Sequence, residues 1–299
     1  MSQYTIHIKP TNNPDIVKFE TNQFLTRHEN FEFGNIEEAA NSPIAQQLFH
    51  LPFVKTVFIA QNFIAIQKYN IVPWADVQEE VAEQIKNYLN SGSPVINVKN
   101  EPTGKVPVTI YAESTPNPSV LKFVANKKLV ISPAEFKSID DTQNAPLANQ
   151  LFHFPFVKEV FIDENYISIN KYDIAEWNDI TPEIREFIRV YLQDDKEIIT
   201  SESAVVRNES PISEEPANLD DVSKEVVQIL NEYIKPAVSS DGGNIIFDSY
   251  QPDTKTVKVI LQGACSGCPS STATLKNGIE SMMRDMMHGK VEYVEAING

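Results

Sequence analysis

Two stretches of the chain carry nearly the same order of hydrophobic and polar positions. Residues 41–74 read NSPIAQQLFHLPFVKTVFIAQNFIAIQKYNIVPW, and residues 144–177 read NAPLANQLFHFPFVKEVFIDENYISINKYDIAEW. The similarity extends over about 4–90 and again over about 108–193. A period of this length indicates a duplicated domain, because the repeats of solenoid proteins are much shorter. We call these two regions the first copy and the second copy.

The first half of each copy predicts two strands and a short helix. In the first copy, residues 4–8 and 16–20 alternate between apolar and polar side chains, as half-buried strands do. Residues 43–50 are expected to form the helix, with Ser42 as its N-cap and Pro43 in its first turn.

The second half predicts a hairpin and a longer helix. Residues 54–59 and 63–68 are rich in strand-forming side chains and are joined by a tight turn, where Asn62 would tolerate a positive φ. Residues 75–89 carry apolar side chains at helical spacing. Each copy is therefore expected to be a small α/β unit.

The last 80 residues predict a third small domain with the element order α-β-β-α-β. Its expected elements are a helix from Asp220 or Asp221 to Pro236, strands over 244–250 and 256–262, a helix bearing Leu275 and Ile279, and a strand over 291–294. Asp241-Gly242-Gly243 is expected to be a turn, because glycine adopts backbone angles that other residues resist.

The predicted fold class is α/β (α+β), with three small domains. The domain boundaries expected are a first copy over 1–92, a linker over 93–107, a second copy over 108–193, a flexible acidic linker over 194–218, and a C-terminal domain over 219–299.

Composition and charge narrow the class of function. Hydrophobic residues make up 41% and charged residues 22%, which are values of a globular protein. A net charge of -16 repels phosphate groups and anionic lipids, so we expect neither nucleic acid nor a membrane as partner. The chain has no apolar run of about 18 residues, and residues 1–10 lack the pattern of a signal or transit peptide. On these grounds a cytoplasmic location is expected.

Only two cysteines occur in the chain, Cys265 and Cys268. A close pair favours metal or redox chemistry over structural disulfides. Cysteines three positions apart on a loop can direct both sulfurs at one centre, and Gly267 between them lets the backbone curve tightly. Pro269 suits the first turn of a helix, which would place Cys268 at a helix N-terminus, where free N–H groups favour a thiolate.

The number of ligands bears on the kind of centre, but spacing alone does not select it. Iron–sulfur clusters and structural zinc sites each take about four ligands, and one chain supplies two. Two chains meeting about a two-fold axis would supply four thiolates. A redox dithiol is the third alternative, although Ala264 stands where an aromatic residue often precedes such pairs. From spacing alone, the cluster, the zinc site and the redox pair have comparable weight.

The C-terminal segment 222–297 resembles the Nfu family, the NifU-like C-terminal domain of iron–sulfur scaffold and carrier proteins. The resemblance rests on Ile234-Lys235-Pro236, Asp241-Gly242-Gly243, Leu261-Gln262-Gly263-Ala264-Cys265, Cys268-Pro269-Ser270-Ser271 and Thr274-Leu275-Lys276-Asn277-Gly278-Ile279. The two copies look like the N-terminal domain of mitochondrial-type Nfu proteins, through Thr115-Pro116-Asn117-Pro118, Leu121-Lys122-Phe123 and the Pro-Leu/Ile-Ala-x-Gln-Leu-Phe run. The chain has two such domains where one is usual.

The resemblance implies a scaffold or carrier that is not an enzyme. Cys265 and Cys268 match the family's cluster-ligand positions. The cluster, usually [4Fe-4S], would bridge two subunits of a homodimer. The implied partners are upstream cluster-assembly proteins and apo iron–sulfur clients. A thiol–disulfide oxidoreductase and a zinc-clamped dimeric interaction protein are the alternatives.

Other candidate residues are interpreted structurally. His50 and His153 occupy equal positions among apolar neighbours and are expected to pack or to form hydrogen bonds. Trp74 and Trp177 are expected to anchor the core at helix starts. The methionines at 282, 283, 286 and 287 are mostly expected in the core, with one or two available to a partner.

Overall fold

The computed structural model describes residues 3–26, 29–97, 107–200, 220–266 and 269–298. The chain divides into two compact units, residues 1–107 and residues 108–299. The first unit holds the first copy, and the second unit holds the second copy together with the C-terminal domain. The predicted mixture of helices with open sheets is confirmed.

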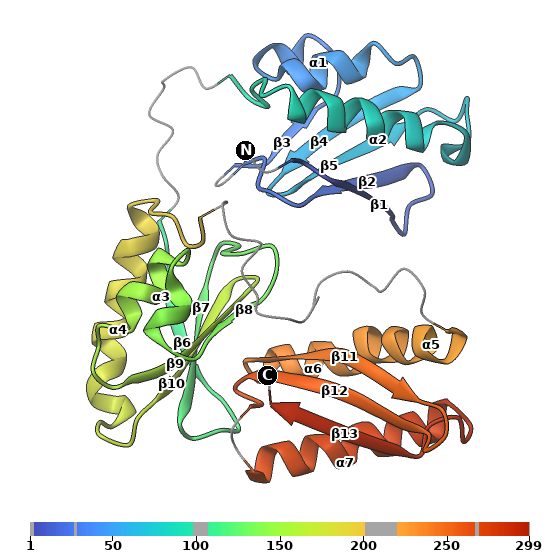
Figure 1. The fold of residues 1–299 in the computed structure, drawn as a ribbon. Helices are drawn as coiled ribbons and strands as arrows, with labels where there is room; N and C mark the ends of the chain where they lie inside the picture. The colour runs from blue at the N-terminus through green and yellow to red at the C-terminus, as the bar shows by residue number, and fades with distance from the viewer. Residues whose placement is uncertain (1–2, 27–28, 98–106, 201–219, 267–268, 299) are drawn as a thin grey trace. The chain divides into compact units, whose positions relative to one another are not determined.

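The first copy is a five-stranded antiparallel sheet with two helices over one face (Figure 1). The strand order is β1-β2-β5-β4-β3. Its elements are β1 (Ile6–Pro10), β2 (Ile16–Thr21), β3 (Phe31–Phe33), α1 (Pro43–Phe49), β4 (Val54–Ala60), β5 (Phe63–Lys68) and α2 (Trp74–Asn90). Ser42 caps α1 as predicted, since its side chain accepts a hydrogen bond from the Ala45 amide.

The structure differs from the predicted hairpin turn in detail. Gln61, and not Asn62, has the positive φ, at 45°. The Asn62 side chain is buried instead and donates a hydrogen bond to the carbonyl of Thr21. The edge strand β3 was not predicted, because three residues are too short to display a period of two.

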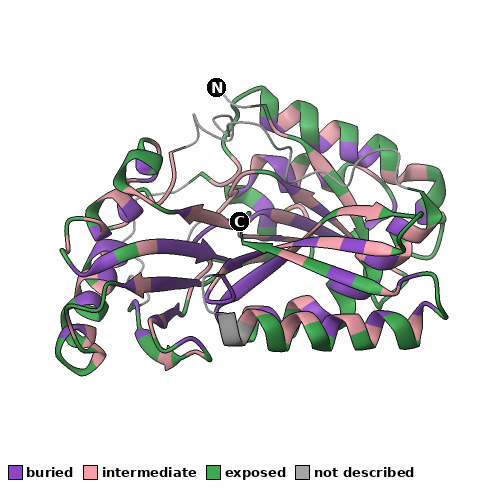
Figure 2. Ribbon diagram, turned by 60° about the horizontal axis from the view of Figure 1, so that its bottom comes forward, coloured by how far each residue is buried: buried purple, intermediate pink, exposed green. Residues whose placement is uncertain are grey.

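The second copy repeats this topology with the order β6-β7-β10-β9-β8. Its elements are β6 (Ile110–Ser114), β7 (Val120–Ala125), β8 (Ala134–Phe136), α3 (Pro146–Leu151), β9 (Val157–Asp163), β10 (Tyr166–Lys171) and α4 (Trp177–Gln193). Strands β7, β9 and β10 are largely buried, and α4 has a buried and an exposed side. Figure 2, coloured by burial, shows helices with both kinds of side.

The second copy differs from the first in the burial of its central strands. Exposure alternates along β2 of the first copy, as expected for a sheet with one covered face. Four consecutive residues at the end of β7 and four at the start of β10 are buried. Besides the main core, Val124, Phe161 and Tyr166 form a separate buried cluster. The sheet of the second copy is therefore covered on both faces.

The C-terminal domain is a three-stranded sheet with the order β11-β12-β13. Its elements are α5 (Asp221–Ile229), a π-helical turn (Leu230–Ile234), α6 (Lys235–Ser240), β11 (Gly243–Gln251), β12 (Thr256–Gly263), α7 (Pro269–Met286) and β13 (Tyr293–Asn298). β12 and β13 are parallel, so α7 is the crossover that connects them.

The prediction that the first helix ends at Pro236 was wrong. The helical path continues through the π-helical turn into α6, where Pro236 lies in the first turn. A proline there costs little, since the first N–H groups of a helical segment need no partner within it. The domain core includes two of the four methionines, Met283 and Met287, both 0% exposed, and Met282 and Met286 are partly buried against it.

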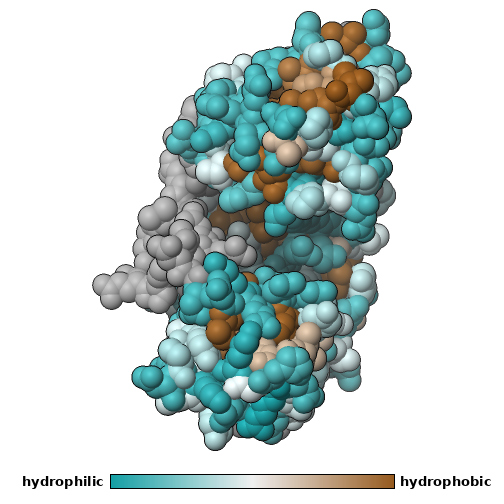
Figure 3. All heavy atoms as spheres, turned by 90° about the vertical axis from the view of Figure 1, so that its right-hand side faces the viewer, coloured by the Kyte–Doolittle hydropathy of each residue, from teal (hydrophilic) through white to brown (hydrophobic). Residues whose placement is uncertain are grey.

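The face of the molecule that Figure 3 shows is predominantly hydrophilic. On the face drawn in Figure 3, apolar side chains form separate groups among hydrophilic ones. No helix in the described parts of the chain is both long and apolar enough to cross a lipid bilayer.

Candidate functional site

The loop that carries Cys265 leaves the end of β12, the central strand of the C-terminal sheet. Gly263 is the last residue of β12 and has a φ of +63°. The Ser266 amide donates a hydrogen bond to the Gly263 carbonyl, and the Thr272 hydroxyl donates one to the Cys265 carbonyl. These bonds turn the backbone between β12 and α7. Cys268 lies outside the described residues, so its role as a ligand stays a prediction.

Two glycines, Gly242 in the turn before the neighbouring strand β11 and Gly243 at its first position, make room for this loop. Gly242 has a φ of +81°, and its carbonyl accepts a hydrogen bond from the Ala264 amide. Gly243 is paired in register with Gly263. A Cβ on Gly243 would lie 2.7 Å from Cys265 Sγ. The predicted Asp241-Gly242-Gly243 turn thus has two parts: Gly242 provides the positive φ, and Gly243 allows the thiol to approach the strand.

Burial favours the protonated form of the Cys265 thiol. Cys265 is 8% exposed. Burial, with a smaller effect of the Asp241 carboxylate, raises the pKa of Cys265 to about 12. In this conformation Cys265 is a neutral thiol at pH 7, and it must lose its proton to bind a metal.

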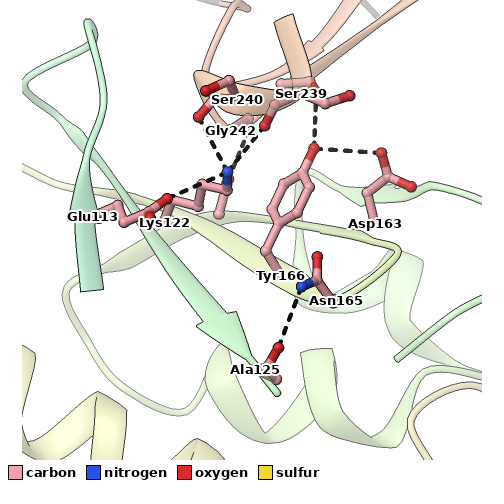
Figure 4. Close-up of polar contacts among 11 residues, drawn as sticks. Glu113, Lys122, Ala125, Asp163, Asn165, Tyr166, Ser239, Ser240 and Gly242 are labelled. Atoms are coloured by element: carbon pink, nitrogen blue, oxygen red, sulfur yellow. Dashed lines mark hydrogen bonds and ion pairs between the residues drawn. The ribbon is translucent and has the colours of Figure 1, made fainter. Parts of the chain in front are cut away.

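The second copy contributes polar side chains to the backbone around this loop (Figure 4). Lys122 donates hydrogen bonds to the carbonyls of Ser239 and Ser240. Further contacts are Ser168 Oγ to the Gly242 carbonyl, Tyr166 OH to the Gly243 carbonyl, Asn117 Nδ2 to the Ala264 carbonyl, and the Gly263 amide to Glu135 Oε1. Burial is the largest cause that raises the pKa of Glu135 and of Tyr166.

The sequence prediction did not include these residues of the second copy. A signal was present: Tyr166 and Ser168 stand where the first copy has Phe63 and Ala65. Two hydroxyl groups that are present on β10 and absent from the equivalent strand β5 indicate polar contacts that the first copy does not make.

His50 and His153 form hydrogen bonds with the helices that precede them. The Nδ1 atoms of His50 and His153 lie 2.8 Å from the carbonyls of Gln46 and Asn149, one helical turn earlier. This confirms the expected hydrogen-bonding role. Among the described residues, no group of three or more His, Cys, Asp or Glu side chains could hold a metal ion. Within that part of the chain, a complete metal site would need ligands from outside.

Family models account for most of the sequence. The model described as "Scaffold protein Nfu/NifU N terminal" matches residues 6–92 and again 110–195, and the model described as "NifU-like domain" matches residues 226–295. The chain belongs to the Nfu/NifU family. The expected order of two N-terminal-type domains followed by a NifU domain is thereby confirmed.

Curated relatives carry names that agree with this family. NifU-like protein 4, mitochondrial, of Arabidopsis thaliana is 34% identical over 64% of this chain and 64% of its own length. NFU1 iron-sulfur cluster scaffold homolog, mitochondrial, of Drosophila willistoni is 34% identical over 65% of each chain. NifU-like protein, mitochondrial, of Saccharomyces cerevisiae is 31% identical over 64% of this chain and 81% of its own length. The chain thus spans slightly under two thirds of the first two relatives.

These names overturn one expectation. The prediction of a cytoplasmic location was wrong, because these Nfu/NifU relatives are named as mitochondrial proteins. The prediction rested on the absence of a targeting pattern, and an absent pattern does not determine a location. The family model that matches both copies is described as that of a scaffold protein, which is not an enzyme class.

Proposed function

We propose that this Nfu/NifU chain is a scaffold and carrier for an iron–sulfur cluster, with [4Fe-4S] as the cargo. Cys265 and Cys268 of two chains would hold the cluster, which is then passed to apo-proteins. The observation that carries the proposal is the placement of Cys265. Its thiol lies against Gly243 on a loop that is turned by glycines, at the end of the central strand of a NifU-like domain.

The ligand set supports a site that two chains share. A cluster is commonly held by four thiolates, and the whole chain contains two cysteines. Since the described residues offer no group of three candidate ligands, other side chains of that part of the chain do not complete the set. A homodimer with two-fold symmetry supplies two Cys265 and two Cys268 thiolates.

A shared site suits a cargo that must leave. Transfer would proceed by exchange of ligands, in which a client's thiolates replace those of Cys265 and Cys268 one at a time. No electron is gained or lost in this exchange, and each released carrier thiolate can take up a proton. The clients are apo iron–sulfur proteins, and the upstream partners are proteins that assemble clusters. The names of the relatives as iron–sulfur cluster scaffolds support this direction of transfer.

The assignment of ligands is tested by two single variants and a control. Cys265→Ser and Cys268→Ser should each abolish retention of iron and sulfide after anaerobic reconstitution, while the far-ultraviolet circular dichroism stays unchanged. Ser266→Ala, a change on the same loop between the two cysteines, should retain the cluster. A Cys268→Ser chain that holds a full and stable cluster would refute the proposed ligand set. Stoichiometric zinc without sulfide, or a reversible disulfide with reductase activity, would support the zinc or the redox alternative instead.

A further inference from the structure

The second copy makes hydrogen bonds almost entirely with main-chain atoms of two segments, the end of α6 with its glycine turn and the start of the Cys265 loop. At the end of α6, Lys122 Nζ lies 3.1 Å from the carbonyls of Ser239 and Ser240. A positive charge is favourable at a helix C-terminus. Beside it, the hydroxyls of Ser168 and Tyr166 donate to the carbonyls of the glycine turn at 2.6 and 2.9 Å.

The start of the loop is held by two contacts, one in which a side chain of the second copy donates a hydrogen bond and one in which a side chain accepts. Asn117 Nδ2 donates to the carbonyl of Ala264 at 3.3 Å, next to Cys265 in the chain. Glu135 Oε1 accepts from the Gly263 amide at 2.8 Å. Because the second copy satisfies main-chain groups of both segments, the turn and the loop are held together from outside their own domain.

Close apolar packing accompanies these bonds. Phe161 Cδ1 would lie 2.8 Å from a Cβ built on Gly263, and Ser168 Oγ would lie 2.8 Å from one built on Gly242. Phe161 and Tyr166 are 2% and 4% exposed, although they lie outside the main core of the second copy. Side chains that are buried in this way contribute apolar burial to the contact as well as hydrogen bonds.

The first copy lacks some of the side chains with which the second copy contacts the C-terminal domain. It has the lysine and the phenylalanine at the equivalent positions, Lys18 and Phe58. It has Phe63 and Ala65 in place of Tyr166 and Ser168, so the two hydroxyl bonds to the glycine turn cannot form. The duplicated domains have therefore diverged at the surface that meets the loop, and only the second copy carries the full set.

We infer that the second copy is a reversible cover for the Cys265 loop, docked in the cluster-free chain and displaced when the loop meets another chain. The inference rests on the proposed function, since a cluster shared by two chains needs the loop of each to be accessible. In the docked arrangement Cys265 is 8% exposed, and the second copy is hydrogen-bonded to the two residues that precede it, Gly263 and Ala264, and to Gly243 on the facing turn. The cover would protect the thiol until a partner competes for the same surface.

The test removes the two hydroxyls that distinguish the copies. In a Cys268→Ser background the full-length chain has a single thiol, Cys265, and its reaction with N-ethylmaleimide is followed by mass spectrometry. The variant is Tyr166→Phe with Ser168→Ala, which are the residues that the first copy already carries. The control is Tyr111→Phe with Ser114→Ala, which removes the same two groups from the exposed strand β6 of the same copy.

Loss of two hydrogen bonds should raise the population of the undocked state and the reaction rate by about 10-fold to 100-fold. The control should react at the parent rate. Both rates should be the same at low and high protein concentration, because the cover belongs to the same chain. A variant that reacts at the parent rate would overturn the inference, as would a rate that falls with rising protein concentration.

A second measurement separates this inference from the proposed function. With both cysteines present, the Tyr166→Phe, Ser168→Ala chain should acquire iron and sulfide faster than the parent during reconstitution. Faster maleimide reaction with unchanged cluster loading would overturn the role of the cover in loading. If no chain binds a cluster, the proposed function fails, and the maleimide comparison still decides whether the second copy covers the thiol.

Discussion

Replacing Gly243 with alanine should displace the Cys265 thiol from its place on β11. The added Cβ would lie 2.7 Å from Cys265 Sγ and 2.8 Å from the carbonyl oxygen of Gln262. The first distance is about 0.7 Å short of the 3.4 Å at which ordinary contact begins. The second neighbour is backbone of the paired strand β12, which cannot move without disturbing the ladder.

The loss of unfolding free energy caused by Gly243→Ala can be estimated from these short distances. Overpacking of this kind costs about 1–3 kcal/mol, and the reduced flexibility of alanine in the unfolded chain offsets about 0.4–1 kcal/mol of it. A net loss of about 1–2 kcal/mol corresponds to a Tm lower by about 2–8 °C for a unit of this size. Because the displaced atom is the proposed ligand, retention of the cluster should fall more sharply than stability.

Thermal unfolding followed by circular dichroism, with iron content after desalting, measures both effects. Gly278→Ala on α7 is the matched control, since its Cβ would have no neighbour within 4 Å. That control should gain about 0.5–1 kcal/mol, because alanine is the better helix former. A Gly243→Ala chain with the parent's Tm and iron content would refute the idea that the strand closely supports the thiol.

Three further changes test the fold. Phe123→Ala, at a side chain that is 0% exposed, should lose about 3–5 kcal/mol in urea unfolding, whereas Tyr111→Ala at 52% exposure should change stability by less than about 0.5 kcal/mol. Ser42→Ala should lose about 1 kcal/mol through its lost N-cap, and an unchanged urea midpoint would contradict the capping geometry. Hydrogen bonds from Ser223 hold the pKa of Asp220 below 3.8, so its stabilising effect is present above that pH and is lost as pH falls through the lowered pKa. The stability difference between the parent and Asp220→Ala should therefore shrink in acid, and a constant difference down to pH 2.5 would contradict the cap.

Elements with a long, regular pattern could be predicted from the sequence. The amphipathic helix α2 and the hairpin β4–β5 occur within a residue of their expected positions. The short strands β3 and β8 could not be found, because three residues do not establish a period. The continuation past Pro236 could not be found either, since it depends on a π-helical turn whose backbone geometry has no simple sequence pattern.

The residues of the candidate site also fall into those that could be predicted from the sequence and those that could not. Cys265 and the glycine turn were recognisable because their chemistry is local to a few consecutive residues. The contribution of the second copy was not recognisable, because Lys122, Tyr166 and Ser168 meet the end of α6 and the glycine turn only through tertiary packing. The difference between the two copies was the available clue, and its meaning required a structure.

One combined measurement decides whether two chains share a cluster. The full-length protein is purified without oxygen and reconstituted with iron and sulfide, and its absorption spectrum, iron, sulfide and native mass are measured on the same sample. We expect a brown dimer with about four iron and four sulfide per two chains. A colourless monomer that binds zinc, or that only cycles a disulfide, would contradict it.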